Sequence, residues 1–280
     1  MISICFKSLN KKTIIDLESL LEKLNIDNVI YVQRKFSSYF NLIVHFKGKN
    51  ANKFYEDISD LFSSYIINYH ENRLVKSQMQ LDFFYFSSDE QKEILDLINK
   101  KLNNTDIYNK KFSILNKDFL SNLINTKKIY IDGIINFRLS DYKKYLNTLL
   151  EKEIHEYVIN KEYTQYIDLL KSYIIEKSND TEKASELVHL LYSDAEKVIL
   201  DKSYNTITTT YGKKYLSDIS FSENDFILNS ILSLMPQRII IHTSDKNDNF
   251  IIFLQKIFEN KINFCEDCKI CKNKKIYTIK

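Results

Sequence analysis

Three of the four cysteines of this chain lie close together as Cys265, Cys268 and Cys271, in the stretch FCEDCKICK. Two thiolates at C-x-x-C spacing can bind one metal ion from a single turn, and a third cysteine in the same register adds a ligand. The spacing also occurs in bacterial iron–sulfur proteins, although the fourth cysteine and the following proline of that pattern are missing here. Binding of zinc or an iron–sulfur cluster, thiol redox chemistry and inert reduced cysteines therefore stay open.

The segments before the cysteines predict how a fourth ligand is brought to them. RIIIH (238–242) reads as a buried strand, residues 247–258 as a helix and KINFC (261–265) as another strand. Parallel strands of a β-α-β unit end at the same sheet edge, which is where open α/β sheets bind ligands. We therefore expect His242 to lie beside Cys265, which completes a Cys₃His zinc set.

His189 and Cys5 are alternative fourth ligands, although a hydrogen-bonded core imidazole is the simpler interpretation of His189 inside LVHLL. The lysines around the cluster are expected to lower the pKa of its thiols. If a metal takes all three thiols, no open position is left, and a structural or sensing role is favoured over hydrolysis.

The rest of the C-terminal region also predicts α/β structure. Residues 186–192 and 196–202 read as paired strands around a turn at Ser193 and Asp194. Ser222 is expected to cap a helix that runs to about Leu234, and Pro236 closes it because proline lacks a backbone donor.

The first seventy residues predict a small α/β module of the order β-α-β-β-α. Apolar spacing indicates a strand at 2–6, a helix at 11–24, a hairpin of strands at 29–33 and 41–46, and a helix at 50–69. Ferredoxin-like and other small modules share this order, so it implies no function by itself.

The middle of the chain, about 70–178, predicts mainly helices. Ser88 and Gln91 form an expected capping box, and a second helix covers about 115–126. The stretch 129–137 interrupts this pattern, with a turn expected at Gly133. A long amphipathic helix follows over 138–177, with a break expected near Asn160.

The predicted fold class is therefore α+β, with the N-terminal α/β module, a helical middle, and a C-terminal α/β region that contains the β-α-β unit. The corresponding domains are 1–70, 71–178 and 179–280, and 71–280 is treated as one family domain.

Composition excludes many enzyme classes. The chain has three glycines, which stand alone, so no Walker loop, dinucleotide fingerprint or G-x-S-x-G elbow is present. No apolar run is long enough for a spanning helix, and the first residues lack the pattern of a secretory signal. With clustered, reduced cysteines, these features predict a cytoplasmic protein.

The net charge is +3, of which residues 261–280 contribute a local +4. Such a basic tail suits nucleic acid or an anionic membrane, although a solvated tail is the simpler interpretation.

Several ordered segments resemble one known family. They are DGIINFRLSDYKKYLNTLLEKEIHEYVINKEYTQYIDLLKSYI (132–174), LVHLLYSD (187–194) and PQRIIIH with IFENKINFCEDCKIC (236–271). Over roughly 75–275 the chain resembles the YtxC-like sporulation proteins of endospore-forming Firmicutes. The resemblance implies a cytoplasmic protein linked to endospore formation, with no biochemical activity assigned at family level.

By position, the resemblance carries over a set of motif residues without established roles. They are Asp132, Gly133, Phe137, Arg138, Asp141, Tyr142, Glu156, Tyr157, Glu162, Tyr163, His189, Arg238, His242 and the three clustered cysteines. From the residues themselves, Arg138 and Asp141 are expected to form a helical ion pair, and Glu156 and Glu162 a charged outer face.

The function predicted from all of this is a non-enzymatic interaction or regulatory protein, with protein partners and a metal-binding or redox-sensitive Cys₃His site. The alternatives are a nucleic-acid-binding protein that uses the basic tail, and a metal- or thiol-dependent enzyme.

Overall fold

The computed structural model describes residues 2–24, 26–178, 186–193, 196–207, 222–266 and 268–273. The chain divides into two compact units, Met1–Val158 and Ile159–Lys280, and each is described by itself.

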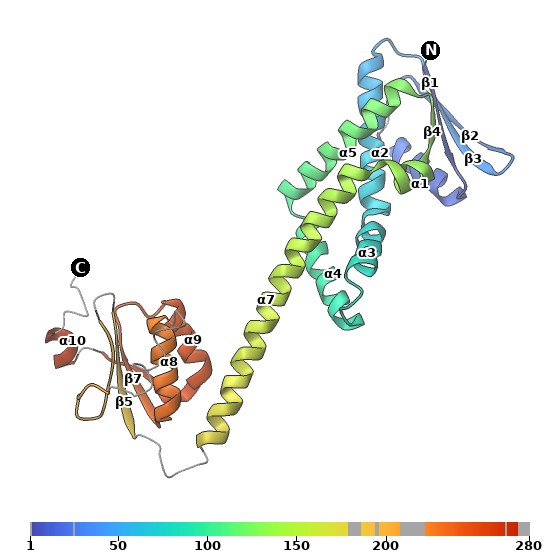
Figure 1. Ribbon diagram of the computed structural model, residues 1–280. Coiled ribbons are helices and arrows are strands. Elements are labelled where there is room, and N and C mark those ends of the chain that lie inside the picture. The colour runs from blue at the N-terminus through green and yellow to red at the C-terminus, as the bar shows by residue number, and fades with distance from the viewer. Residues whose placement is uncertain are drawn as a thin grey trace. The chain divides into compact units, whose positions relative to one another are not determined.

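Unit 1 is built on a four-stranded sheet of order β2-β3-β1-β4 (Figure 1). Its strands are β1 (Ile2–Ser8), β2 (Val29–Phe36), β3 (Tyr39–Phe46) and β4 (Lys128–Tyr130). In the sequence, α1 (Lys11–Leu24) connects β1 to β2, and α2 (Ala51–Tyr69) follows β3. β2 and β3 form the predicted hairpin, and β1 pairs antiparallel with β3 and parallel with β4. The mixed α+β fold and the N-terminal β-α-β-β-α order are confirmed.

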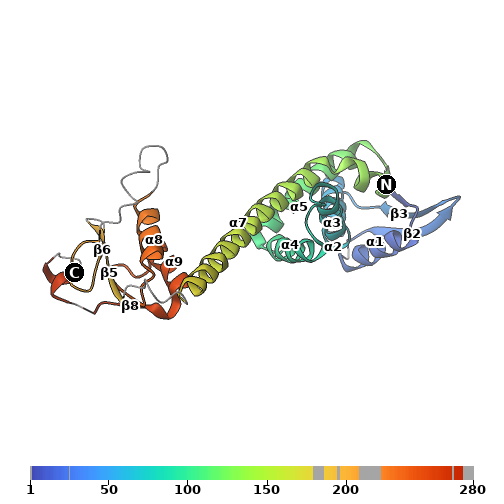
Figure 2. The same cartoon turned by 60° about the horizontal axis from the view of Figure 1, so that its bottom comes forward.

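Alternation along the strands gives this sheet two different faces. Ile4, Phe6, Leu42 and Val44 point into the core with α1 and α2. The opposite side, here called the open face, consists of the odd-numbered residues of β1 and β3 and the even-numbered residues of β2 and β4. Figures 1 and 2 show no described helix over this face.

The helices between α2 and β4 complete the core of unit 1. They are α3 (Glu71–Asp82), α4 (Ser88–Leu102) and α5 (Thr105–Asn125), and they contribute Met79, Ile98 and Phe119 to the same core cluster as the sheet. The helix predicted at 115–126 begins ten residues earlier, at Thr105. Asn104 caps this earlier start, since its side chain accepts from the N–H of Asp106.

Two local predictions in this region were wrong. Ser87, not Ser88, caps α4: its side chain accepts from the N–H of Glu90, and the Glu90 carboxylate accepts from the N–H of Ser87. Gly133 makes no special turn, since it has ordinary helical angles (φ −67°, ψ −39°) at the end of the short helix α6 (Ile131–Gly133).

A π-helix, η1 (Ile134–Arg138), and the helix α7 (Ser140–Ser178) follow. The break expected near Asn160 is absent, since α7 is continuous through that residue. Leu146, Leu150 and Ile154 of α7 join the core of unit 1, whereas Ile167, Leu170 and Ile174 join that of unit 2. Among the described residues, no helix combines the length and apolar character needed to cross a bilayer.

Unit 2 contains a second four-stranded sheet, of order β6-β5-β7-β8. The elements are β5 (Leu187–Tyr192), β6 (Lys197–Leu200), α8 (Glu223–Leu234), β7 (Arg238–His242), α9 (Asn249–Phe258), the 3₁₀-helix η2 (Glu259–Lys261), β8 (Ile262–Phe264) and α10 (Lys269–Asn273). β7 pairs parallel with both β5 and β8, which confirms the predicted β-α-β unit.

The caps of α8 explain its predicted ends. Ser222 forms a capping box with Asp225, and Met235 ends the helix in the left-handed conformation (φ 43°, ψ 56°) directly before Pro236. The turn predicted at Ser193 and Asp194 is described only in part, because Asp194 lies outside the described residues.

The two faces of this sheet are covered differently. Val188, Ile239 and Ile241 point into a large core that α7, α8 and α9 supply with Ile174, Ile231 and Leu254, among others. On the other face, Leu191, Leu200 and Cys271 form a small separate cluster. Figures 1 and 2 show α8 and α9 on one side of β5 and β7 and the short α10 on the other.

Candidate metal centre

The small face of the second sheet brings four metal-ligating side chains together. One ligand atom from each of His242, Cys265, Cys268 and Cys271 can be chosen so that all four lie within 4.8 Å of one another. His242 is 1% exposed and Cys271 is fully buried, whereas Cys265 and Cys268 are half-buried. The topological expectation that His242 meets the cysteines at one sheet edge is therefore confirmed.

Each ligand is placed by a defined element. His242 is the last residue of β7, and Cys265 directly follows the neighbouring parallel strand β8. The N–H of Cys265 donates to the carbonyl of Ile241 at 2.9 Å. This bond extends the pairing of β7 and β8 by one residue and fixes the backbone of Cys265 beside β7. Cys268 precedes α10 and Cys271 lies within it, so one helical turn carries the second and third sulfurs.

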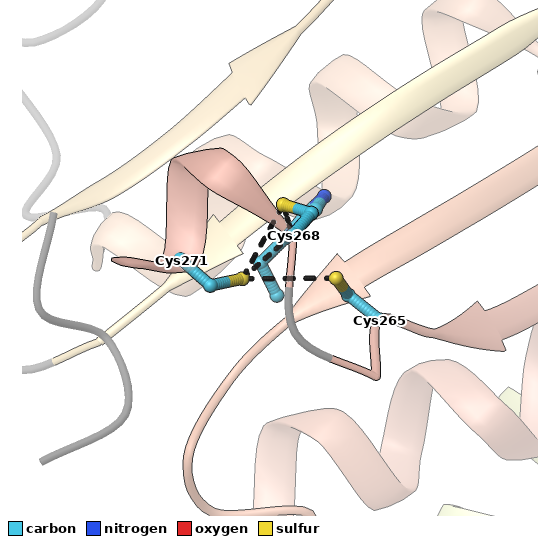
Figure 3. A group of neighbouring side chains, drawn as sticks. Cys265, Cys268 and Cys271 are labelled. Carbon is cyan, nitrogen blue, oxygen red and sulfur yellow. Dashed lines mark hydrogen bonds between the residues drawn. The ribbon is translucent and has the colours of Figure 1, made fainter. Parts of the chain in front are cut away.

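Four of the six separations between the candidate ligand atoms are close to those of a tetrahedral zinc site. The Cys268 and Cys265 sulfurs each lie 3.7 Å from the Sγ of Cys271 (Figure 3). The Nδ1 of His242 lies 3.1 Å from the Sγ of Cys271 and 3.5 Å from that of Cys268. Tetrahedral bonds of about 2.3 Å to sulfur and about 2.0 Å to nitrogen place two sulfurs about 3.8 Å apart and a nitrogen about 3.5 Å from each sulfur.

A second histidine supports the ligand histidine. The Nδ1 of His189, on β5, lies 3.0 Å from the Nε2 of His242, which is the ring nitrogen that faces away from the sulfurs. His189 is 4% exposed, and its ring lies 4.5 Å from that of Tyr204 at an interplanar angle of 37°. Burial lowers the pKa of His189, and the charge of Asp201 opposes this in part. The interpretation of His189 as a hydrogen-bonded core imidazole agrees with this geometry.

Burial controls the protonation of the site. It lowers the pKa of His242 to about 4, with His189 adding to the effect, so the imidazole is neutral near pH 7 and has a lone pair to offer. Burial is the largest of the effects that raise the pKa of Cys271 to about 12, and the sulfur hydrogen bonds that Cys271 accepts from Cys268 and donates to Cys265 act in the same direction. The lowered thiol pKa expected from nearby lysines is wrong for Cys271, because Leu191 and Leu200 enclose it.

Cys5, the other alternative ligand, lies on β1 in unit 1, where its Sγ donates to the Asn41 side chain at 3.8 Å. It is not a member of the four-residue group.

The family-motif residues of unit 1 lie at helix and strand junctions. Asp132 accepts from the Ser8 hydroxyl at 3.2 Å and from the N–H of Leu9 at 2.9 Å, which ties α6 to the end of β1. Arg138 donates to Asn122 at 3.3 Å, and no ion pair between Arg138 and Asp141 occurs in the described residues. Leu139, with ψ 41°, separates the π-helix from α7, so these two residues do not share one continuous helix.

Tyr142, in contrast, belongs to a buried polar group with Glu71 and Lys111, which was not predicted from the sequence. Its hydroxyl donates to the Oε2 of Glu71 at 2.5 Å, and the Nζ of Lys111 lies 2.7 Å from the Oε1. Lys111 also donates to the Leu102 carbonyl at 3.0 Å. Lys111 is 1% exposed and Glu71 7%. The three side chains come from α5, α3 and α7, so no local pattern could have joined them.

Other motif residues lie at the surface of the units. Glu156 pairs with Lys101 at 3.2 Å, and Tyr157 donates to Glu93 at 3.0 Å. Tyr163 lies against the Phe253 ring and under the Nζ of Lys256. The exposed positions without such a contact are Phe137, Glu162 and Arg238. Of the basic tail, residues 261–280, the last seven residues (274–280) and residue 267 lie outside the described residues.

Comparison with known proteins identifies the family of this chain. The model of the YtxC-like family matches residues 56–263. This chain belongs to the YtxC-like family. The uncharacterised protein YtxC of Bacillus subtilis is 22% identical over 136 residues, which are 48% of this chain and 47% of that protein. The chain thus covers about half the length of this relative, and no solved structure matches it significantly.

The family match and the ligand cluster overlap only in part. The match starts at residue 56, earlier than the 75 expected, and it ends at residue 263, two residues before Cys265. It therefore includes His189 and His242 but not Cys265, Cys268 or Cys271. The case for the metal site depends on geometry and not on kinship.

Proposed function

We propose that this chain is a cytoplasmic, sporulation-associated protein without enzymatic activity, which acts through protein contacts and carries a structural zinc ion on His242, Cys265, Cys268 and Cys271. The observation that carries the zinc assignment is that four separations among one nitrogen and three sulfurs are near tetrahedral values, with all four atoms within 4.8 Å of one another. Four protein ligands close the coordination sphere, which leaves no position for a substrate or an activated water.

Zinc suits these ligands better than an iron–sulfur cluster. In a 4Fe–4S cluster each cysteine binds a different iron, and in a 2Fe–2S cluster the four ligands are divided between two irons, so ligand atoms on different irons stand farther apart than ligands that share one ion. Here one atom from each of the four ligands falls within 4.8 Å of the others, which fits a single ion.

The ion would also explain how the end of the chain stays on the sheet. Cys265, Cys268 and Cys271 lie against a face with only a small apolar cluster, and α10 has five residues, too few for a helix that is stable by itself. Metal bonds formed only in the folded state contribute directly to the free energy of folding. The zinc ion would therefore hold Cys268 and α10 against β5, β6 and β7.

Elemental analysis of anaerobically purified protein tests this proposal. The wild type is expected to contain about one zinc per chain, and Cys268→Ser is expected to lose it. Cys5→Ser is the matched control, because it removes the cysteine of unit 1 and should keep the zinc. Replacement of zinc by cobalt should produce the intense visible bands of a tetrahedral thiolate site. Iron with sulfide, a disulfide between clustered cysteines, or no metal in the wild type would overturn the proposal.

The division into domains at 1–70, 71–178 and 179–280 stays a prediction, which limited proteolysis of the zinc-loaded chain can test.

A further inference from the structure

The open face of the sheet in unit 1 has an unusual combination of charge and aromatic surface. Lys7, Arg34 and Lys128 carry its three cations. None of the positions that define this face is Asp or Glu. Within the described part of the chain, no ion pair involves these three cations. The face is therefore a positive surface with no carboxylate among its own residues.

Aromatic rings lie among these cations. Phe36, Tyr39 and Tyr130 are 54%, 36% and 48% exposed, so their rings are accessible to a ligand. The Nζ of Lys7 lies 5.3 Å from the centre of the Tyr130 ring, and the rings of Tyr39 and Tyr130 meet edge to face at 5.8 Å. A cation and two rings are thus held together at one end of the face.

We propose that this open face binds single-stranded RNA. Lysine and arginine would contact the phosphates, while bases would stack on the exposed rings, which is how sheet surfaces and ssRNA-binding grooves recognise unpaired nucleotides. The hydroxyl of Ser3 and the imidazole of His45, 2.7 Å apart on the same face, offer hydrogen-bonding groups for a ribose 2′-hydroxyl.

Charge separates this occupant from a second copy of the chain. Two open faces packed together would place three cations against three cations without a carboxylate between them, and like charges opposed in this way repel. A polyanion neutralises them, and flat bases use the exposed rings. This inference is independent of the zinc proposal, because it involves strands of unit 1 only.

Fluorescence anisotropy of the full, zinc-loaded chain with a labelled oligouridylate of about eight nucleotides tests the proposal. Binding is expected with a Kd on the order of 10 µM at about 50 mM salt. Three phosphate contacts predict a slope of log K against log salt of about −2, or roughly a tenfold loss of affinity at about 150 mM. No binding at the lower salt concentration would overturn the proposal.

Two pairs of matched variants locate the binding surface. Arg34→Glu combined with Lys128→Glu should weaken binding about tenfold or more, whereas Lys76→Glu combined with Lys92→Glu, on exposed positions of α3 and α4, changes the net charge equally and should have little effect. Tyr130→Leu should weaken binding roughly fivefold or more, and Tyr85→Leu, in the α3–α4 loop, should not. Equal losses in a variant and its control would contradict the proposal, provided circular dichroism shows that both are folded.

Three further measurements distinguish RNA binding at the open face from binding at the tail and from binding of any anion. A chain that ends at residue 273 should bind as the full chain does, and loss of binding there would assign it to the basic tail. The deoxyuridylate of equal length should bind more weakly, and equal or tighter binding would overturn the assignment to RNA. Polyglutamate should compete poorly, because it has charges but no bases to stack on the exposed rings. Competition as strong as that of unlabelled RNA would show that the face binds any polyanion.

Discussion

The Nδ1 of His189 lies 3.0 Å from the Nε2 of His242, so both ring nitrogens of His242 have partners: an imidazole on one side and sulfurs on the other. When the Nδ1 of His242 binds a metal, its Nε2–H donates to His189, which fixes the tautomer and the orientation of the ring. His189→Leu is therefore expected to weaken zinc binding about tenfold to a hundredfold. Competition with a chromophoric chelator measures this change.

His189→Gln is the matched variant for this prediction, because its side-chain oxygen can still accept from His242. We expect it to retain more of the zinc affinity than His189→Leu does. If the leucine variant bound zinc as tightly as the wild type, His189 would have no role in positioning the ligand.

The buried group of Lys111, Glu71 and Tyr142 gives a second prediction, on stability. Lys111→Met removes the cation 2.7 Å from the Glu71 carboxylate and leaves that carboxylate buried with only the Tyr142 hydroxyl. We expect the free energy of unfolding to fall by about 3–5 kcal/mol in urea titration, because an unpaired buried charge is costly. Glu71→Leu combined with Lys111→Met should cost less than Lys111→Met alone, since no charge is then left.

Lys101→Met is the control for this change. Lys101 pairs with Glu153 at 2.6 Å and with Glu156 at 3.2 Å. Its side chain is 29% exposed, whereas the side chain of Glu153 is only 10% exposed, close to the 9% of Glu71. The two variants therefore differ in the burial of the lysine and not in that of the carboxylate left behind. A smaller loss than that of Lys111→Met is expected, because water reaches Lys101 and Glu156 and screens the charges of this group. Equal losses for the two lysines would show that the burial of Lys111 has no special cost.

The cap of α4 gives a third prediction. Ser87→Ala removes the hydroxyl that accepts from the N–H of Glu90, and a loss of about 1 kcal/mol is expected in the same titration. Ser88→Ala should have a smaller effect, since Ser88 is already the first residue of the helix. The reverse order would restore the cap predicted from the sequence.

This cap shows why some features follow from sequence and others do not. Ser87 and Ser88 both have a Glu or Gln three residues later, so the motif alone is ambiguous by one residue. The meeting of His242 and Cys265 could be predicted, because β-α-β topology brings strand ends together whatever the details of packing. The burial of Lys111 could not, since its partners Glu71 and Tyr142 are far away in sequence and only tertiary packing joins them.

The full length of α5, like the burial of Lys111, depends on tertiary packing and could not be predicted from local sequence. Its first half, TDIYNKKF, is polar enough to read as a loop, and the helix there is defined by the Asn104 cap and by packing on α2 and α4. Gly133 was misread because glycine permits a turn without requiring one, and here the backbone simply enters the next helical segment.

The imidazole of His70, between α2 and α3, gives a prediction for pH. Its Nε2 lies 2.8 Å from the Tyr65 hydroxyl. Burial and then the charge of Arg73 lower the pKa of His70, against opposing effects of Asp132 and Asp16. Protonation is therefore favoured in the unfolded chain, and the unfolded chain binds more protons once the pH falls below about 6.5. The stabilisation that depends on neutral His70 is complete above that pH and is lost on acidification.

His70→Gln removes this titration, so the free energy of unfolding should fall less in the variant than in the wild type between about pH 7 and about pH 5. Urea titrations at both pH values measure the two changes, and the difference between variant and wild type cancels the carboxylates that titrate in both chains. His155→Gln changes an exposed imidazole on α7 and controls for the substitution itself. Parallel pH dependences for His70→Gln and the wild type would show that the protonated ring is tolerated in the folded chain, despite its hydrogen bond with Tyr65 and the nearby charge of Arg73.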